Sequence, residues 1–197
     1  MLGEPERKAI GRLWTRKLAQ DDAQLPSQER HRNLEPASAE FLCAMASGLG
    51  ARRMLEIGGS SGISTIALAA AARATGGKLV SIEIEPERQA ESKETVGALG
   101  LGDYVDFILG DAATVLSSIG EVSFAFIDCE KEDYISFFDL LVVGPGSVVV
   151  ADNILSHDLF DYVRHVRARP GAEGVTFPVG NGLEVTLFYT MPQEASV

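Results

Sequence analysis

The chain has 197 residues, 46% of them hydrophobic, and a formal net charge of −11. This length and composition suit one globular domain, and the acidity argues against DNA or RNA as substrate, because such a field repels phosphates. No stretch approaches the roughly 20 apolar residues of a membrane helix, and residues 1–20 lack an apolar signal core. We therefore expect a cytoplasmic protein that binds neither DNA nor a membrane. Cys43 and Cys129 are far apart in sequence, so neither a disulfide nor a cysteine metal site is expected.

Two helices are predicted first, over residues 4–20 and after Pro36, with a polar loop over residues 24–32 between them. The expected apolar stripe of the first helix is Ile10, Leu13, Trp14 and Leu18. The expected apolar face of the second is Phe41, Leu42, Met45 and Leu49, with Cys43 as a packing residue. We expect one domain, in which residues 1–50 form a helical segment over the substrate side and residues 51–197 form the cofactor-binding core.

From residue 52 on, short apolar runs alternate with helical patterns. The predicted strands are residues 53–57, 78–84, 104–109, 122–127 and 147–151. This alternation predicts βαβ units and a mostly parallel sheet covered by helices on both faces. Near the end, Gly180-Asn-Gly182 separates residues 174–179 from 183–190, which indicates an antiparallel hairpin.

The first predicted strand runs into a glycine-rich turn, from Glu56 through Gly58, Ser60 and Gly62 to Ser64. Ligands of open parallel sheets bind beyond the carboxyl ends of the strands, and glycines there allow a tight turn and close approach. Ser60 breaks the G-x-G-x-x-G pattern, so a nicotinamide enzyme is disfavoured. The carboxylate of Glu56 suits a ligand with an ammonium group, such as the methionine end of S-adenosylmethionine.

The next two strand ends also carry acids. Glu83, which we favour over Glu85, is placed to accept hydrogen bonds from ribose hydroxyls, with Ile84 beside it. Asp111, followed by Ala112, is placed to meet an adenine amino group, although it also fits a helix N-cap.

Three oxygen-bearing side chains follow the fourth and fifth strands, namely Asp128, Asp152 and Asn153. These two strand ends are neighbours in a doubly wound sheet, and such a set suits Mg²⁺ with waters and substrate completing the shell. The alternative is that Asp152 and Asn153 only form a turn and cap.

The order and spacing of these motifs, together with Ile127-Asp128-x-x-Lys131, resemble the metal-dependent O-methyltransferases, which include the catechol and caffeoyl-CoA enzymes. The resemblance runs from about residue 33 to 188. It implies a Rossmann-like seven-stranded sheet of order 3-2-1-4-5-7-6 with strand 7 antiparallel. It also implies that the methionine part of S-adenosylmethionine is held by Glu56, Gly58 and Ser64, with Ser60 and Gly62 in the same loop. It implies further that Glu83 binds the ribose and that Asp111 and Ala112 contact the adenine. Asp128, Asp152 and Asn153 would bind the metal, and Asp128 would also lie beside the cofactor. Lys131 stands where the family keeps its general base; the alternative is a surface lysine that pairs with Glu130 or Glu132.

The chain departs from the family after Asn153, where a helix is expected within a few residues. In the catechol enzyme a carboxylate holds a substrate hydroxyl, and the corresponding position in this sequence is near Val175. No acidic residue occupies that position, and the nearest one is Glu173, so a catechol substrate is not favoured. His157 follows Asn153 closely and has no counterpart in the family pattern; it is either a cap or surface residue, or a substrate contact. His31 and His165 are interpreted as surface residues. Members of the family commonly form dimers, so a homodimer stays open.

These features predict an S-adenosylmethionine-dependent O-methyltransferase that acts on a hydroxyl of a small molecule with the help of a divalent metal. One alternative is a tRNA-modifying O-methyltransferase of similar fold, which the acidity of the chain disfavours. Another is a non-catalytic S-adenosylmethionine-binding domain, which the intact Asp128, Lys131, Asp152 and Asn153 disfavour.

Overall fold

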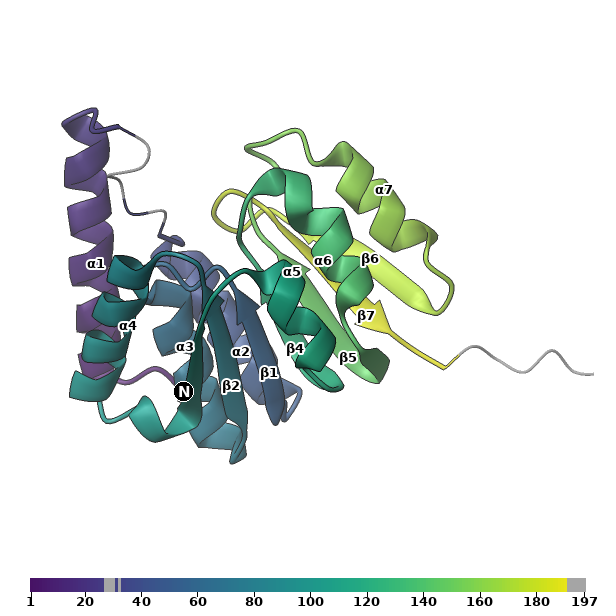
Figure 1. Cartoon of the computed structure of the whole chain (residues 1–197), viewed down its shortest axis with the longest axis horizontal. Coiled ribbons are helices and arrows are strands. Elements are labelled where there is room, and N and C mark those ends of the chain that lie inside the picture. Colours follow the sequence, from purple (N-terminus) through teal and green to yellow (C-terminus); the bar gives the residue numbers. More distant parts are fainter. Residues whose placement is uncertain (27–30, 32, 191–197) are drawn as a thin grey trace, which may run out of the picture.

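Seven strands form a single sheet at the centre of the chain (Figure 1), of which the computed structural model describes residues 1–26, 31 and 33–190. The strands are β1 (Arg53–Ile57), β2 (Lys78–Glu83), β3 (Val105–Leu109), β4 (Val122–Ile127), β5 (Val143–Ala151), β6 (Ala172–Phe177) and β7 (Leu183–Phe188). Their order is β3-β2-β1-β4-β5-β7-β6, and β7 is antiparallel to both β5 and β6. The sheet predicted from the sequence, including its closing hairpin, is therefore confirmed.

Helices cover both faces of this sheet (Figure 1). They are α1 (Glu4–Asp22), α2 (Pro36–Gly48), α3 (Ile63–Thr75), α4 (Pro86–Ala98), α5 (Ala112–Val115), α6 (Tyr134–Leu140) and α7 (Phe160–Ala168), with 3-10 turns at Gly102–Tyr104, Leu116–Ser118 and Lys131–Asp133. One core lies between the sheet and α1 to α4, and the other lies under α5, α6 and α7. Within the described residues, no helix is both long enough and apolar enough to cross a membrane.

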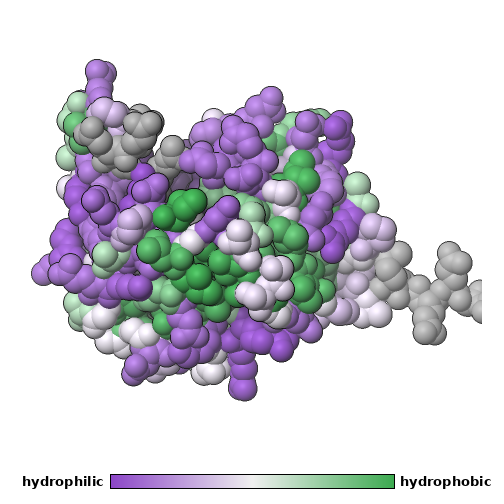
Figure 2. Space-filling model, in the orientation of Figure 1, coloured by the Kyte–Doolittle hydropathy of each residue, from purple (hydrophilic) through white to green (hydrophobic). Residues whose placement is uncertain are grey.

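The two faces of the sheet are covered unequally. On the first face, α3 carries an unbroken buried run from Ile63 to Ala72, and its small alanines let it pack closely against the sheet and α2. On the second face, α5 is only four residues long. Figure 2 shows an apolar area on this side of the molecule, over the region of α5, surrounded by hydrophilic side chains.

The N-terminal helices use different faces from those expected. In α1 the buried apolar residues are Ala9, Ile10 and Leu13, whereas Leu18 is 43% exposed, so its place in the predicted stripe is wrong. The reason is that only the first half of α1 packs against the core, whereas its last turns reach the cavity described below, which Lys17 and Asp21 line.

The α2 helix turns a smaller apolar face inward than the sequence predicted. Its buried apolar residues are Ala39, Leu42, Cys43 and Ala46, whereas Leu49 is 45% exposed. The neighbouring α3 presents alanines, and small side chains on both helices allow a close approach. Much of the predicted loop over residues 24–32, namely 27–30 and 32, lies outside the described residues.

Replacing Leu13 with alanine tests whether α1 belongs to the core. Leu13 is 2% exposed and packs in the first core, so Leu13→Ala is expected to lower the free energy of unfolding by about 2–5 kcal/mol. Leu18→Ala, in the same helix, is the matched control and is expected to change it by less than about 0.5 kcal/mol. Urea denaturation measures both, and equal effects would contradict the packing.

Candidate functional site

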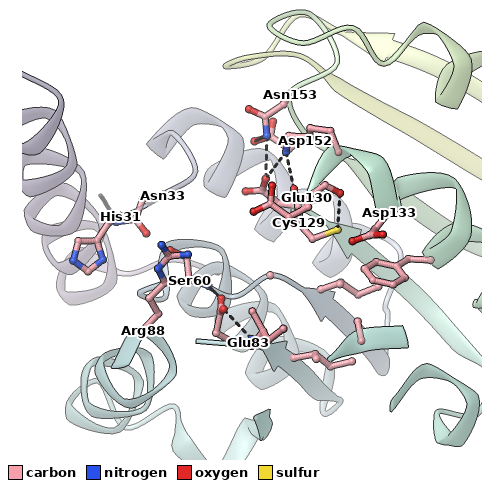
Figure 3. Close-up of a pocket in the computed structure, with 18 of the residues that line it drawn as sticks. His31, Asn33, Ser60, Glu83, Arg88, Cys129, Glu130, Asp133, Asp152 and Asn153 are labelled. Atoms are coloured by element: carbon pink, nitrogen blue, oxygen red, sulfur yellow. Dashed lines mark hydrogen bonds and ion pairs between the residues drawn. The ribbon is translucent and has the colours of Figure 1, made fainter. Parts of the chain in front are cut away.

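A cavity of about 640 Å³ opens at the carboxyl edge of the sheet, where the strand ends meet residues of the N-terminal segment (Figure 3). Most of the predicted site residues line it, namely Gly58, Ser60, Glu83, Ile84, Asp111, Ala112, Asp128, Lys131, Asp152 and Asn153. Three predicted residues are not part of its lining, namely Glu56, Gly62 and Ser64. The sequence therefore brings the predicted cofactor and metal groups to one place, and their contacts with ligands stay predictions.

Glu56 lies behind the cavity wall. Alternation along β1 turns its side chain toward α3, where Thr65 Oγ1 and Ser81 Oγ donate to Oε2 at 2.7 and 2.6 Å. Burial raises the pKa of this carboxyl, against hydrogen bonds from Ser64, Ser81 and Thr65. Its other oxygen, Oε1, is buried and has no hydrogen-bond partner among the described residues. Glu56 thus ties the end of β1 to the first turn of α3 and to β2.

The glycines of this turn serve the protein's own packing. A Cβ at Gly58 (φ +91°) would collide with the backbone carbonyl of Asp128, so this glycine lets the ends of β1 and β4 approach. A Cβ at Gly62 (φ +108°) would meet Ser92 Oγ at 2.8 Å, so the helix start packs against α4. We expected these glycines to let a ligand approach the backbone. At both Gly58 and Gly62 it is a neighbouring element of the protein that makes this close approach.

Glu83 holds the far side of the turn. Its carboxylate accepts hydrogen bonds from the backbone N–H of Ser60 at 2.7 Å, and of Ile84 and Glu85 at 2.9 Å each. Ser60 itself has φ +46°, an uncommon angle for a residue other than glycine. A carboxylate offers about four acceptor positions, so Glu83, which is buried at the cavity edge, keeps capacity for a ligand hydroxyl. Glu85 is exposed and does not line the cavity.

Asp111 combines both roles considered from the sequence. It is the N-cap of α5, where its side chain accepts from Ala113 N at 2.8 Å, and it also lines the cavity. Its side chain is exposed, so its second carboxylate face is open to a ligand.

The ends of β4 and β5 bring the predicted metal residues together (Figure 3). The amide Nδ2 of Asn153 donates to Asp128 Oδ1 at 2.9 Å and to Asp152 Oδ2 at 3.2 Å. Asn153 has φ +65°, a left-handed conformation that asparagine tolerates better than most residues. Burial and the charge of Asp128 raise the pKa of Asp152 to about 8.

Lys131 begins the 3-10 turn after β4, so its side chain folds back over the strand end. Its Nζ lies 3.3 Å from Asp128 Oδ1 and donates to Cys129 O at 3.1 Å and Tyr134 Oη at 2.7 Å. The ion pair that the structure gives Lys131 is therefore with Asp128, inside the site. Cys129 is half-buried, packs against the second core and also lines the cavity.

The residues present fit a divalent cation. The carboxylates of Asp128 and Asp152 both accept a hydrogen bond from the amide of Asn153. The other oxygen of Asp152, Oδ1, is buried with no hydrogen-bond partner among the described residues. An unpaired buried carboxylate oxygen costs free energy that a cation would offset. The described residues contain no group of three or more His, Cys, Asp or Glu side chains placed to hold a metal. Asn153 would supply the third oxygen ligand only with its amide turned over, because Nδ2 faces both carboxylates here.

The N-terminal segment adds cavity residues that the sequence did not single out, namely Lys17, Asp21, His31, Asn33 and Glu35. His31 is half-buried rather than a surface residue, and burial and the charge of Arg16 lower its pKa. Asn33 accepts from Ser61 Oγ at 2.8 Å, while its own Nδ2 is buried without a partner among the described residues. No local motif marks these residues, because tertiary packing alone brings them to the strand ends.

The other two histidines are His165, on α7, and His157, at the rim of the cavity. His165 lies on α7, where its Nε2 is 2.8 Å from Asp139 Oδ1, and is half-buried rather than fully exposed. His157 is exposed at the cavity rim, and its Nδ1 lies 3.0 Å from Ser156 Oγ. A substrate contact by His157 stays open.

Comparison with known proteins places the sequence and the fold in a family. The model of the O-methyltransferase family matches residues 12–168. Catechol O-methyltransferase of Mycobacterium tuberculosis is 31% identical, in an alignment that covers 70% of this chain and 62% of the relative. Caffeoyl-CoA O-methyltransferase 2 of Zea mays is 30% identical, in an alignment that covers 62% of this chain and 51% of the relative. These alignments span only about half to three fifths of the curated relatives.

A solved structure extends the likeness over nearly the whole fold. Cofactor-bound Rv0187 from MTB is 25% identical and has a TM-score of 0.76, with 89% of each chain covered. Because the family model covers well over half of the sequence, the chain belongs to the O-methyltransferase family.

Proposed function

We propose that this chain transfers the methyl group of S-adenosylmethionine to a hydroxyl of a small acceptor molecule. The observation that carries the proposal is the meeting of Lys131, Asp128, Asp152 and Asn153 in one cavity with the turn that Glu83 holds. Membership of the O-methyltransferase family and the names of the relatives support it. We also propose that residues 1–50 cover the acceptor end, whereas residues 51–197 hold the cofactor, within one domain.

In this proposal the residues divide by role. Glu83 accepts from the ribose, Asp111 and Ala112 face the adenine, and the turn from Gly58 to Ser60 borders the methionine part. Asp128, Asp152 and Asn153 would hold a divalent cation, which, when bound, draws the acceptor hydroxyl close and favours its ionised form.

The transfer itself then needs a base and the alignment of donor and acceptor. Lys131 acts in its neutral amine form, after its ammonium has released a proton to solvent. Its Nζ then takes the proton of the acceptor hydroxyl, the new bond forms between that oxygen and the methyl carbon, and the carbon–sulfur bond breaks. S-adenosylhomocysteine leaves with the bonding electron pair on sulfur. Holding donor and acceptor in line accelerates the transfer, because it replaces an encounter in solution.

A methyl-transfer assay tests the proposal directly. Purified chain, S-adenosylmethionine, Mg²⁺ and a panel of small hydroxylated acceptors are expected to yield S-adenosylhomocysteine and an O-methylated product. Binding of S-adenosylhomocysteine without turnover of any acceptor would favour a non-catalytic binding domain, and turnover of tRNA alone would favour the tRNA-modifying alternative.

Glu83→Ala tests the cofactor end. We expect it to weaken S-adenosylhomocysteine binding by about 1.5–3 kcal/mol, since hydrogen bonds to a charged group contribute about that much. The backbone N–H of Ser60 also loses its acceptor, which adds to the loss. Calorimetry measures the effect, with the exposed Glu85→Ala as a charge-matched control that should bind like the wild type; equal losses in both variants would remove Glu83 from the site.

A further inference from the structure

Tyr134 is a buried hydrogen-bond partner of the proposed base. The 3-10 turn Lys131–Asp133 leads directly into α6, whose first residue is Tyr134, and residues at this spacing lie one above the other on such a turn. Lys131 Nζ donates to Tyr134 Oη at 2.7 Å, the shortest of its three contacts at this strand end. Nζ also lies 4.7 Å from the centre of the tyrosine ring. The lysine thus contacts both the hydroxyl and the ring of Tyr134.

Tyr134 is itself held firmly in place. Its side chain is fully buried in the second core, and its ring packs edge-on against the ring of Tyr162, with 5.4 Å between the ring centres. Its hydroxyl donates to the backbone carbonyl of Asp152 at 3.4 Å. Burial raises the pKa of Tyr134 well above its ordinary value, so the hydroxyl keeps this proton. The lone pairs of Oη therefore face Lys131 from a fixed position.

The contacts of Nζ determine which side of the nitrogen stays open. Besides its bond to carbon, a lysine nitrogen has three tetrahedral positions. Two of them face neutral oxygens fixed by the fold, namely Tyr134 Oη at 2.7 Å and the backbone carbonyl of Cys129 at 3.1 Å. The third faces Asp128 Oδ1 at 3.3 Å, on the side of the predicted metal residues. A neutral amine has two hydrogens, and the two shorter contacts can hold both, so its lone pair points to this third side.

We propose that Tyr134 is a positioning residue, whose hydroxyl holds Nζ of Lys131 so that the lone pair faces the acceptor hydroxyl. This inference rests on the proposed function for the role of Lys131. Tyr134 is not among the residues that line the cavity, so it acts through Lys131 and not by contact with cofactor or acceptor. A small misplacement of a reacting group lowers the rate of the chemical step, so the hydroxyl should affect kcat and leave KM unchanged.

Tyr134→Phe removes the hydroxyl and keeps the buried ring. We expect it to lower kcat by about 10–100-fold, with KM for the acceptor and affinity for S-adenosylhomocysteine within about twofold of the wild type. Tyr162→Phe is the matched control, because Tyr162 is buried in the same core and its Oη has no hydrogen-bond partner among the described residues. It is expected to keep kcat within about twofold. An equal loss of kcat in both variants, or a change in KM alone, overturns the role of Tyr134.

Two further measurements test whether the hydroxyl acts through Lys131. In a Lys131→Ala background, Tyr134→Phe is expected to change kcat by less than about twofold, because the group that it positions is gone. A further loss as large as in the wild-type background overturns the inference. The hydroxyl also neighbours the carbonyl of Asp152 and the side chain of Asn153. Calorimetry should therefore show Mg²⁺ affinity within about twofold of the wild type in Tyr134→Phe, and a parallel loss of Mg²⁺ binding would assign the effect to the metal residues instead.

A readout that needs no turnover separates this inference from the proposed function. In protein labelled with ¹³C-lysine, the Cε signal of Lys131 is assigned by its absence in Lys131→Ala. Nuclear magnetic resonance relaxation is expected to give a lower order parameter for this carbon in Tyr134→Phe and an unchanged one in Tyr162→Phe. An unchanged order parameter in Tyr134→Phe overturns the positioning role, even if methyl transfer is observed. Absence of methyl transfer overturns the proposed function, while the order parameter still shows whether Tyr134 holds Lys131.

Discussion

Replacing Lys131 with alanine is expected to lower kcat for methyl transfer by about 10²–10⁴-fold, the range that a positioned proton acceptor contributes. The expectation follows from the position of its Nζ, 3.3 Å from Asp128 Oδ1 and 2.7 Å from Tyr134 Oη, at the strand end where the acceptor hydroxyl must lie. Binding of S-adenosylhomocysteine should change little, because Glu83, Asp111 and the glycine-rich turn remain. Steady-state kinetics and calorimetry measure the two effects separately.

Lys17→Ala is the matched control for this variant. Lys17 also lines the cavity, but it pairs with Asp21 at 2.6 Å on α1, away from the strand ends. It is expected to keep kcat within about twofold of the wild type, because its Nζ pairs with Asp21 on α1 and not with a residue at the end of β4 or β5. A wild-type rate and pH profile in Lys131→Ala would place the base elsewhere, and His157, at the rim of the same cavity, would be the next residue to replace.

The sheet was predictable because its signals are local. Apolar runs such as residues 53–57 and 122–127 alternate with helical patterns, and Gly180-Asn-Gly182 marks the hairpin between β6 and β7. The faces of the N-terminal helices were less predictable. Leu18 and Leu49 fit a helical stripe, yet Leu18 lies beyond the part of α1 that packs against the core, and Leu49 follows the last residue of α2. Periodicity carries no information about where the packing of a helix ends.

The same distinction applies to the site. Acids at strand ends, such as Glu83, Asp128 and Asp152, could be placed because parallel strands end at one edge of the sheet. Glu56 was predicted in the cavity but lies behind its wall, because alternation along β1 turns it toward α3. Glu35 went unnoticed, because its place depends on a hairpin loop 146 residues away.

Chelation is expected to lower turnover by about 100-fold or more, and added Mg²⁺ is expected to restore it, because a cation at such a site stabilises developing charge by several kcal/mol. The structural reason is the donor set itself, in which Asp152 Oδ1 is buried and unpaired while Asp128 and Asn153 lie within hydrogen-bonding distance of one another. The measurement compares rates in EDTA with rates after Mg²⁺ is returned.

A second readout makes this prediction independent of turnover. Calorimetry with Mg²⁺ alone should detect binding to the wild type and a loss of about tenfold or more in Asp152→Asn, which keeps the shape of the side chain but removes its charge. Asp133→Asn, which changes another acidic residue of the cavity lining, should bind Mg²⁺ like the wild type. Full activity in EDTA would contradict a metal-assisted reaction, whereas equal Mg²⁺ affinity in all three proteins would show that the cation binds elsewhere. In that case Lys131 alone would have to account for activation of the acceptor, and the rate lost in Lys131→Ala would measure that contribution.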